Sequence, residues 1–486
     1  MFNQNDKKHL LIYTFLSFLF IYPLIQAGVY YRDDLDRAIT GQYGWKSLGR
    51  PAADLMMRIF SSSGRENLDL FPYTLLFSSF FIATSALFLK KHLEAAQVRY
   101  ATFSACLLIF NPFMLQNIAY RFDSVGMAFA MMLAVVSYTW NNKKLHPLAE
   151  RLIKIAAGIL ALSIYQPCAN IFIGLIAVDL AIFSTRNEQS PREKTRHISK
   201  KIIDFIIYYS LYVLLVAKIW KHNNSRASTI SFDLSGIETI TYTCKKLFAM
   251  VSSFLYGPVI VYFAIPLFIA ILVALYKILK DTEHRYFKLF CLISSFLLLT
   301  LSLLGPNIIL REAPVFPRIL VSFSVFFVVV ALLLDHCALK ARYLVLIPVI
   351  TVFAFSAQLS SALKAQREHE DMVFNIITQD LLKSGELKTI TLIGQVNINP
   401  RAAILVKNKP LLNYFLSPAS GFLASYQLIN KGFMQTTHGY DKAQEERIIE
   451  ATIIAHNTKP QISNQEYSIY ISDNNAVVAL GSERSD

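Results

Sequence analysis

Apolar runs long enough to cross a bilayer recur along most of this chain. A helix needs about 17 to 25 mainly apolar residues to span the hydrocarbon core. Runs near that length occur at roughly 10–31, 71–89, 100–115, 125–140, 152–166, 168–184, 202–220, 247–276, 289–304, 319–334 and 343–361. Charged residues make up only 16% of the chain, against about 25% in an ordinary soluble domain. The pattern predicts a polytopic α-helical membrane protein with about eleven transmembrane helices.

The basic residues predict how the chain is oriented. If the N-terminus is cytoplasmic, the inner connectors hold 21 Lys and Arg in 70 residues, about twice the density of the outer connectors. That asymmetry is the one the positive-inside rule requires. No small-residue cleavage site follows the first run, so we expect it to be retained as a span. Because the basic residues form no stripe, we expect no nucleic acid as a partner.

Residues 362–486 differ in character from the rest. They carry 12 basic and 13 acidic residues, a net charge of −1, whereas residues 1–361 carry 35 and 20, a net charge of +15. Helical periodicity covers Gln366–Leu382, and strand-like runs cover Leu387–Val396, Tyr467–Ser472 and Ala476–Leu480. A turn signal, Asp473-Asn474-Asn475, separates the last two runs. We therefore predict a membrane domain at 1–361 and a small α/β domain at 362–486, which eleven spans place on the outer side.

The predicted spans contain very little charge. Asp179 and Asp204 are the only acids in them, both near predicted inner ends; Lys154 and Lys218 stand close to span ends, and no histidine lies in a span. We interpret both acids as reaching the inner interface. A transporter coupled to protons or ions would show a midplane acid, lysine or histidine, so the pattern counts against that class.

Acids and arginines gather at the start of the first outer loop, residues 32–70. The loop opens Arg32-Asp33-Asp34-Leu35-Asp36-Arg37. Adjacent carboxylates suit glycosyl transfer, in which one takes the proton of an acceptor hydroxyl while another orients that base or binds a metal or a sugar hydroxyl. A solvated helix end with local ion pairs is an equal alternative.

The same loop carries a second pattern. Apolar residues recur at helical spacing over 48–60, with Asp54 and Arg58 on the opposite side. This spacing predicts a helix that lies in the outer interface rather than crossing the membrane. Such a helix either roofs a cavity open to lipid or serves only as packing.

The next two outer turns carry polar residues that are candidates for binding. Arg121 and Asp123 stand in a tight turn between two spans. A guanidinium suits a phosphate leaving group, and an internal Arg121–Asp123 pair is the alternative. Tyr165 and Gln166 precede Pro167, where they either bind sugar hydroxyls or simply stand at a helix break.

A last outer turn places Arg311 and Arg318 on either side of two prolines. These two arginines are candidates for a lipid-phosphate clamp, and contact with lipid headgroups is the alternative. Nucleotide-phosphate motifs, H-E-x-x-H and C-x-x-C are absent from the sequence. We expect no nucleotide cofactor and no metal site built on those motifs.

The order of these motifs resembles the Gtr-type serotype-converting glucosyltransferases, which are encoded by phages or prophages of enteric bacteria. The resemblance is carried by Arg-Asp-Asp-x-Asp-Arg after a single span, then Asn111-Pro112-Phe113, then Tyr120-Arg121-Phe122-Asp123-Ser124, then Tyr165-Gln166. It covers nearly the whole chain and is greatest to the type II member of that family. Each motif alone is weak, so the specificity lies in their order.

The resemblance implies transfer of glucose from undecaprenyl phosphate-glucose to a sugar of a lipid-linked O-antigen. The reaction would take place at the periplasmic face of the bacterial inner membrane and cause serotype conversion. The implied architecture is that of the GT-C class, whose first outer loop supplies the catalytic acids. Asp33 and Asp34 match that position, and Arg121, Asp123, Tyr165 and Gln166 match segments of the family pattern with no assigned role.

Two other classes of protein fit parts of the sequence. A transporter or flippase for lipid-linked saccharides also has many spans and basic outer loops. A noncatalytic membrane scaffold would use the C-terminal domain to bind other enzymes. The nearly uncharged spans count against transport.

Overall fold

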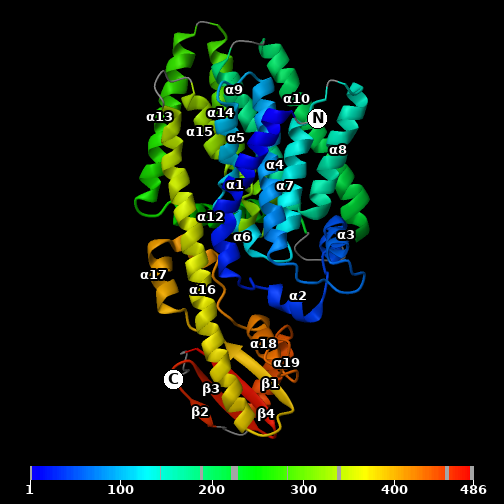
Figure 1. The fold of residues 1–486 in the computed structure, drawn as a ribbon, viewed down its shortest axis with the longest axis vertical. Helices are drawn as coiled ribbons and strands as arrows, with labels where there is room; N and C mark the ends of the chain where they lie inside the picture. Colours follow the sequence, from blue (N-terminus) through cyan, green and yellow to red (C-terminus); the bar gives the residue numbers. More distant parts are fainter. Residues whose placement is uncertain are drawn as a thin grey trace. The chain divides into compact units, whose positions relative to one another are not determined.

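The fold is described by a computed structural model covering residues 3–142, 144–186, 190–220, 228–231, 233–281, 283–335, 341–454 and 459–481. It is mostly helical (Figure 1). The chain divides into two compact units. Unit one comprises residues 1–26, 43–64 and 69–357, and unit two comprises residues 27–42, 65–68 and 358–486.

Unit one consists of helices. Its long elements are α1 (Gln4–Ala27), α4 (Tyr73–Ala95), α7 (Ser124–Thr139), α8 (Pro147–Ile164), α9 (Ala169–Thr185), α10 (Pro191–Tyr212), α12 (Leu234–Phe254), α13 (Val259–Lys280), α14 (Arg285–Leu304) and the first part of α16 (Leu346–Lys383). Shorter ones are α3 (Pro51–Phe60), α5 (Ala101–Cys106), α6 (Leu115–Ala119), α11 (Lys218–Trp220) and α15 (Val325–Leu334). Its interior is formed largely by α4, α7, α9 and α15, whose side chains are mostly buried.

Seven described segments are long and apolar enough to cross a membrane, compared with the eleven spans expected from the sequence. They are Gln4–Ala27, Tyr73–Ala95, Gln166–Thr185, Pro191–Trp220, Val259–Lys280, Arg285–Ile309 and Ala341–Lys383. The four other predicted spans fall on α5, α7, α8 and α15, which are not among these seven segments. The predicted run 247–276 falls on two helices, since α12 ends at Phe254 and α13 begins after Gly257-Pro258.

Large apolar side chains are exposed along the outer helices. On α13 and α14 these include Phe268, Leu272, Tyr276, Phe290, Ile293 and Leu297. A soluble domain would bury such side chains, whereas hydrocarbon solvates them. The exposed apolar surface, together with the seven segments, is that of a polytopic membrane protein.

Unit two contains a four-stranded sheet with strand order β1-β4-β3-β2. The strands are β1 (Thr389–Gly394), β2 (Ile462–Ser463), β3 (Tyr467–Ser472) and β4 (Asn475–Leu480). β1 pairs with β4 in parallel, and the other pairs are antiparallel. The three strand-like runs of the sequence are confirmed as β1, β3 and β4. Asp473 and Asn474 both have positive φ, as the tight hairpin turn between β3 and β4 requires.

Helix α16 runs without a break from Leu346 to Lys383. The sequence analysis predicted two elements here, a span to 361 and a helix from 366. They form one helix because no glycine or proline follows Pro348 until Gly385. In unit two, Val373, Phe374, Ile377 and Leu381 of this helix share a buried core with Ile390, Ile469 and Val478 of the sheet.

Unit two also contains residues 27–42, which directly follow the first span. Its helix α2 (Asp34–Thr40) packs on α18 (Phe422–Ile429), and Leu35, Tyr426 and Ile429 form a small core between them. Gly41 ends α2 with a positive φ, and its carbonyl accepts a hydrogen bond from the backbone N–H of Asn67 at 2.8 Å. The remaining helices of the unit are α17 (Pro400–Asn408) and α19 (Lys442–Ile449). The acid-rich start of the first loop thus packs with residues from the end of the chain.

We predict that Ile377→Ala destabilises unit two by about 2–5 kcal/mol, because the substitution empties a filled core position. Ile377 is 0% exposed, whereas its neighbour Ile376 is 42% exposed. The matched Ile376→Ala variant should change stability by less than about 0.5 kcal/mol. Pulse proteolysis of the detergent-purified full chain across a urea series gives both values. Equal unfolding midpoints for the two variants would contradict this packing.

Candidate functional site

Asp33 is the most accessible acid of the Arg32–Arg37 segment. It immediately precedes α2, and its side chain is 37% exposed. Its Oδ2 atom lies 3.4 Å from Nε of Arg37, one helical turn away. Arg32 adopts a positive φ, and its Nη2 donates to the carbonyl of Tyr414 at 3.1 Å. A partly exposed carboxylate therefore lies beside one arginine, Arg37, at the start of a helix.

Asp34 is fully buried and serves the local backbone. Its Oδ2 accepts a hydrogen bond from the N–H of Tyr31 at 3.0 Å, which closes the turn before α2. The hydroxyl of Tyr31 in turn donates to the carbonyl of Phe415 at 2.9 Å. Through these bonds, Asp34 helps to fix the conformation of the turn that contains Asp33.

Asp36 is also buried, and polar side chains surround it. Its Oδ2 accepts from Nε2 of Gln42 at 2.7 Å and from the hydroxyl of Tyr440, and its Oδ1 accepts from Thr40 at 3.3 Å. Burial and the bond to this carboxylate raise the pKa of Tyr440 above its usual value, and burial and Asp36 raise the pKa of Tyr426 to about 12. Both phenols therefore stay protonated and available as donors at neutral pH.

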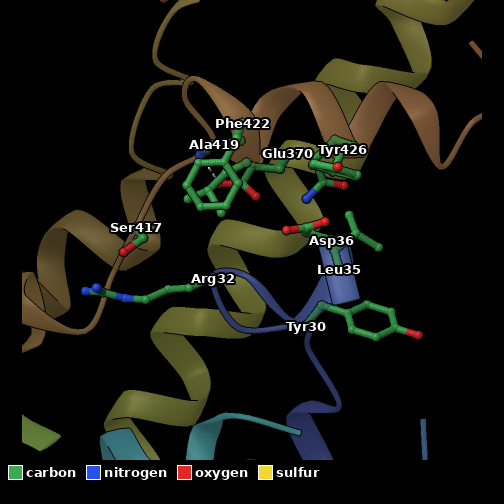
Figure 2. A pocket seen from close by; sticks show the side chains of 11 residues that line it. Tyr30, Arg32, Leu35, Asp36, Glu370, Ser417, Ala419, Phe422 and Tyr426 are labelled. Carbon is green, nitrogen blue, oxygen red and sulfur yellow. Dashed lines mark hydrogen bonds between the residues drawn. The ribbon is translucent and has the colours of Figure 1, made fainter. Parts of the chain in front are cut away.

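A small pocket of about 40 Å³ lies beside Asp36 within unit two (Figure 2). Its polar lining comes from Arg32, Asp36, Glu370, Ser417 and Gln427. Its apolar lining comes from Tyr30, Leu35, Ala419, Phe422, Leu423 and Tyr426. Carboxylate and amide oxygens that accept, beside amide and hydroxyl groups that donate, suit a ligand rich in hydroxyls.

Glu370 belongs to α16 and is buried in the pocket wall. Its Oε1 accepts from Nε2 of Gln366 and from the N–H of Ala419, both at 3.0 Å. The sequence analysis did not single out this residue, because one acid in the helical pattern of 366–382 looks like any solvated position. Figure 2 shows Asp36 and Glu370 on two sides of the same space.

The second group of candidate residues lies in unit one and centres on Arg50. Nε of Arg50 donates to Oε1 of Gln166 at 2.7 Å, and its guanidinium lies 4.9 Å from the ring centre of Tyr165. Nε2 of Gln166 donates to the carbonyl of Leu48 and to the hydroxyl of Tyr212, both at 2.9 Å. Burial lowers the pKa of the Arg50 guanidinium, yet no described carboxylate lies within ion-pair distance of it. A partly buried cation with further N–H donors on its guanidinium is suited to bind an anion.

Arg318 joins this cluster from a different part of the chain. Its backbone N–H donates to Gln116 Oε1 at 3.0 Å, and its Nη1 donates to the hydroxyl of Tyr120 at 2.8 Å. The hydroxyl of Tyr165 donates to the carbonyl of Arg318 at 2.8 Å. The charge of Arg318 contributes to lowering the pKa of Arg50, so two guanidinium groups are held near one another.

Asp123 and Arg121 flank the cluster through other partners. Oδ1 of Asp123 accepts from Nε1 of Trp45 at 2.6 Å. Arg121 forms an ion pair with Asp69 at 2.9 Å and lies 4.3 Å from the ring centre of Phe71. A cavity of about 10 Å³ lies among Trp45, Arg50, Asp123 and Tyr165.

Arg311 differs from the other candidates. It is exposed, and in the described part of the chain its hydrogen bond is a backbone one, from its N–H to the carbonyl of Ser228 at 2.9 Å. The structure thus collects the predicted residues into two sets, Arg32 to Arg37 in unit two and Arg121, Asp123, Tyr165, Gln166 and Arg318 in unit one. Arg311 belongs to neither set.

The helix predicted over 48–60 is observed as α3, with Pro51 at its first turn. Its Leu55 and Ile59 are exposed, whereas Asp54 is buried in an ion pair with Arg58 at 2.8 Å. Lys46 lies 3.9 Å from the same carboxylate. An apolar exposed face over a neutralised buried acid is the arrangement expected of a helix in contact with lipid.

Comparison with known proteins identifies the family. The Glucosyl transferase GtrII family model matches residues 10–334, about two thirds of the chain. This chain belongs to the GtrII glucosyl transferase family. The match covers the Arg32–Arg37 segment and the Arg50 cluster, so both sets of residues lie within the part shared with the GtrII family. The predicted resemblance is confirmed, and the protein is a glycosyltransferase.

A relative from Salmonella phage P22 is similar over most of both chains. It is 26% identical over 432 residues, which are 85% of this chain and 87% of the relative. It is described as an uncharacterized 55.3 kDa protein in the gtrB 5′ region. No solved structure matches this member of the GtrII family.

We predict that Asp34→Ala lowers the stability of unit two by about 1–3 kcal/mol, because the buried N–H of Tyr31 loses its acceptor. The matched Asp33→Ala variant removes a partly exposed carboxylate and should cost less than about 0.5 kcal/mol. Both values come from urea-dependent proteolysis of the full chain. A larger loss in Asp33→Ala than in Asp34→Ala would reverse the assigned roles.

Proposed function

We propose that this enzyme transfers glucose from undecaprenyl phosphate-glucose to a sugar of a lipid-linked O-antigen, which results in serotype conversion. The acceptor would be glucosylated at the periplasmic face of a bacterial inner membrane. The observation that carries the proposal is Asp33, a partly exposed acid in a turn otherwise made of buried carboxylates, within the stretch matched by the GtrII family model. The phage relative described by its position beside gtrB supports a phage-encoded role.

Asp33 acts as the general base. Its ionised carboxylate takes the proton of the acceptor hydroxyl, the resulting oxygen attacks the anomeric carbon of glucose, and the bond to the lipid phosphate breaks. Asp34 is the alternative base, but the bond from the Tyr31 N–H and its burial favour a positioning role. Arg37 orients Asp33 from one helical turn away.

Arg50 and Arg318 bind the phosphate of the donor. The leaving phosphate gains charge as the glycosidic bond breaks, and preformed guanidinium donors stabilise that charge. Gln166, Tyr165 and Tyr120 hold the two arginines. Arg121 and Asp123 support the same region through Asp69 and Trp45, and Arg311 contacts lipid headgroups.

The pocket beside Asp36 holds sugar hydroxyls. Arg32, Asp36 and Glu370 present charged groups to it, and Phe422 and Tyr426 supply aromatic faces. The outer placement of residues 362–486 predicted from the sequence suits contact with the O-antigen acceptor. In this proposal the N-terminus is cytoplasmic, eleven spans cross the membrane, and the C-terminal α/β domain is periplasmic.

The test replaces the base and measures transfer. We expect Asp33→Asn to reduce glucosylation by about 10²–10⁴-fold, the usual contribution of a general base. The readout is O-antigen mass spectrometry in a host that supplies the lipid-linked donor, with membrane insertion checked by immunoblot. Asp371→Asn, at an exposed ion pair on α16, should retain full hexose addition. Full transfer in Asp33→Asn, Asp34→Asn and the double variant would contradict the assignment of the general base to this segment.

A second test addresses the donor phosphate. We expect Arg50→Lys to slow transfer by about 10²-fold, because an ammonium lacks the fork geometry of a guanidinium. Initial rates with purified protein and synthetic donor provide the measurement. Arg58→Lys, which keeps a cation beside Asp54, is the matched control. Equal rates in the two variants would remove Arg50 from the donor site.

A further inference from the structure

Unit one contains a second cavity, of about 430 Å³, that shares no residue with the candidate site. It lies where α4, α7, α8, α9 and α10 come together, and these helices are labelled in Figure 1. Its lining includes His92, Lys154, Asp179, His197, Lys200 and Lys201. The glycosyl-transfer mechanism uses none of these side chains.

Asp179 organises one wall of the cavity. The sequence analysis expected this acid to reach the inner interface, but it is buried. Its Oδ1 lies 2.7 Å from Nε2 of His92, and its Oδ2 lies 2.9 Å from Nε2 of His197. The hydroxyl of Tyr138 donates to the same carboxylate at 2.5 Å. Three side chains therefore satisfy this carboxylate, and neither Lys200 nor Lys201 lies within ion-pair distance of it.

The other acids nearby are also paired. Asp204 forms an ion pair with Arg151 at 2.7 Å, and Glu150 forms one with Lys154 at 2.5 Å. In the part of the chain that the structure describes, no carboxylate lies within ion-pair distance of Lys200 or Lys201. Nζ of Lys201 donates instead to the carbonyl of Tyr138 and lies 4.2 Å from the centre of that ring. The three lining lysines, Lys154, Lys200 and Lys201, therefore outnumber the two lining acids, Asp179 and Asp204, by one.

Apolar side chains flank the cavity on its outer helices. Leu148 and Leu152 of α8 and Ile202, Ile203 and Ile206 of α10 are exposed. The Arg151–Asp204 pair joins the two helices between these side chains. A ligand with a negative headgroup and hydrocarbon chains would neutralise the lysines and cover this apolar surface. A free anion would neutralise the lysines but would leave the apolar surface uncovered.

We propose that this cavity binds the phosphate headgroup of an anionic phospholipid, with Lys200 and Lys201 as its cationic contacts and the acyl chains along α8 and α10. Each lysine near an anionic headgroup strengthens the binding of that headgroup. The site is separate from the sugar-transfer machinery, so its failure would leave the proposed glucosyl transfer untouched.

Native mass spectrometry of the purified full chain tests the proposal with phosphatidylglycerol as the probe and phosphatidylcholine as the zwitterionic comparison. We expect wild type to retain phosphatidylglycerol preferentially, and Lys200→Ala/Lys201→Ala to weaken its binding at least tenfold. Lys7→Ala/Lys8→Ala removes two adjacent exposed lysines of α1 and should leave binding unchanged. If the double variant fails to fold, Lys200→Ala alone replaces it in the test. This single variant keeps the bond between Lys201 and Tyr138, and we expect it to weaken phosphatidylglycerol binding about threefold.

Titration calorimetry with inorganic phosphate separates the two sources of the anion. Phosphatidylglycerol binding that depends on the lysines, with no measurable binding of inorganic phosphate, supports the lipid assignment. Lysine-dependent binding of inorganic phosphate without phosphatidylglycerol retention would overturn it in favour of a soluble phosphate. Equal phosphatidylglycerol binding in wild type and Lys200→Ala/Lys201→Ala would overturn the site itself.

Discussion

Three side-chain amides hold the backbone at residues 318–321, and the arrangement of the unit-one cluster depends on them. Asn111 Nδ2 donates to the carbonyls of Leu320 and Val321 at 2.9 and 3.0 Å, and Asn170 Nδ2 donates to that of Ile319 at 3.1 Å. Gln116 accepts from the N–H of Arg318. Inside a bilayer, a chain that leaves the helical pattern has no water to satisfy its polar groups. The buried amides replace that water, and so allow the irregular segment that carries Arg318.

The same requirement governs the buried carboxylates. Asp34, Asp36, Asp54 and Asp179 are all buried, and each is matched by hydrogen-bond donors or cations from nearby residues or from a distant part of the chain. An unmatched buried charge would cost several kcal/mol. Asp33 is partly exposed, which leaves part of its carboxylate accessible to a substrate hydroxyl. Arg50 shows a related case, a partly buried cation whose partners are an amide and an aromatic ring.

Much of the fold could be predicted from local patterns. The strands at 467–472 and 475–480 follow from β-branched and aromatic residues around an Asp-Asn-Asn turn, and α3 follows from helical spacing after Pro51. The number of spans was harder to predict. The runs at 100–115 and 319–334 are apolar enough for spans, yet Asn111-Pro112 and the segment after Pro317 interrupt their helices. Arg50 and Glu370 could not be predicted as site residues because only their partners, Gln166 and Ala419, distinguish them from other loop and helix residues.

The sequence by itself determined that the chain belongs in a bilayer, because exposing its long apolar runs to water would be energetically unfavourable. The order of its motifs was also sufficient to indicate the family. Tertiary structure alone decided which acid of the Arg32–Arg37 segment is accessible. Asp33, Asp34 and Asp36 lie within four residues, and successive helical side chains point about 100° apart. Their burial therefore depends on partners that include Tyr440, some 400 residues away in the sequence, and no local pattern encodes that packing.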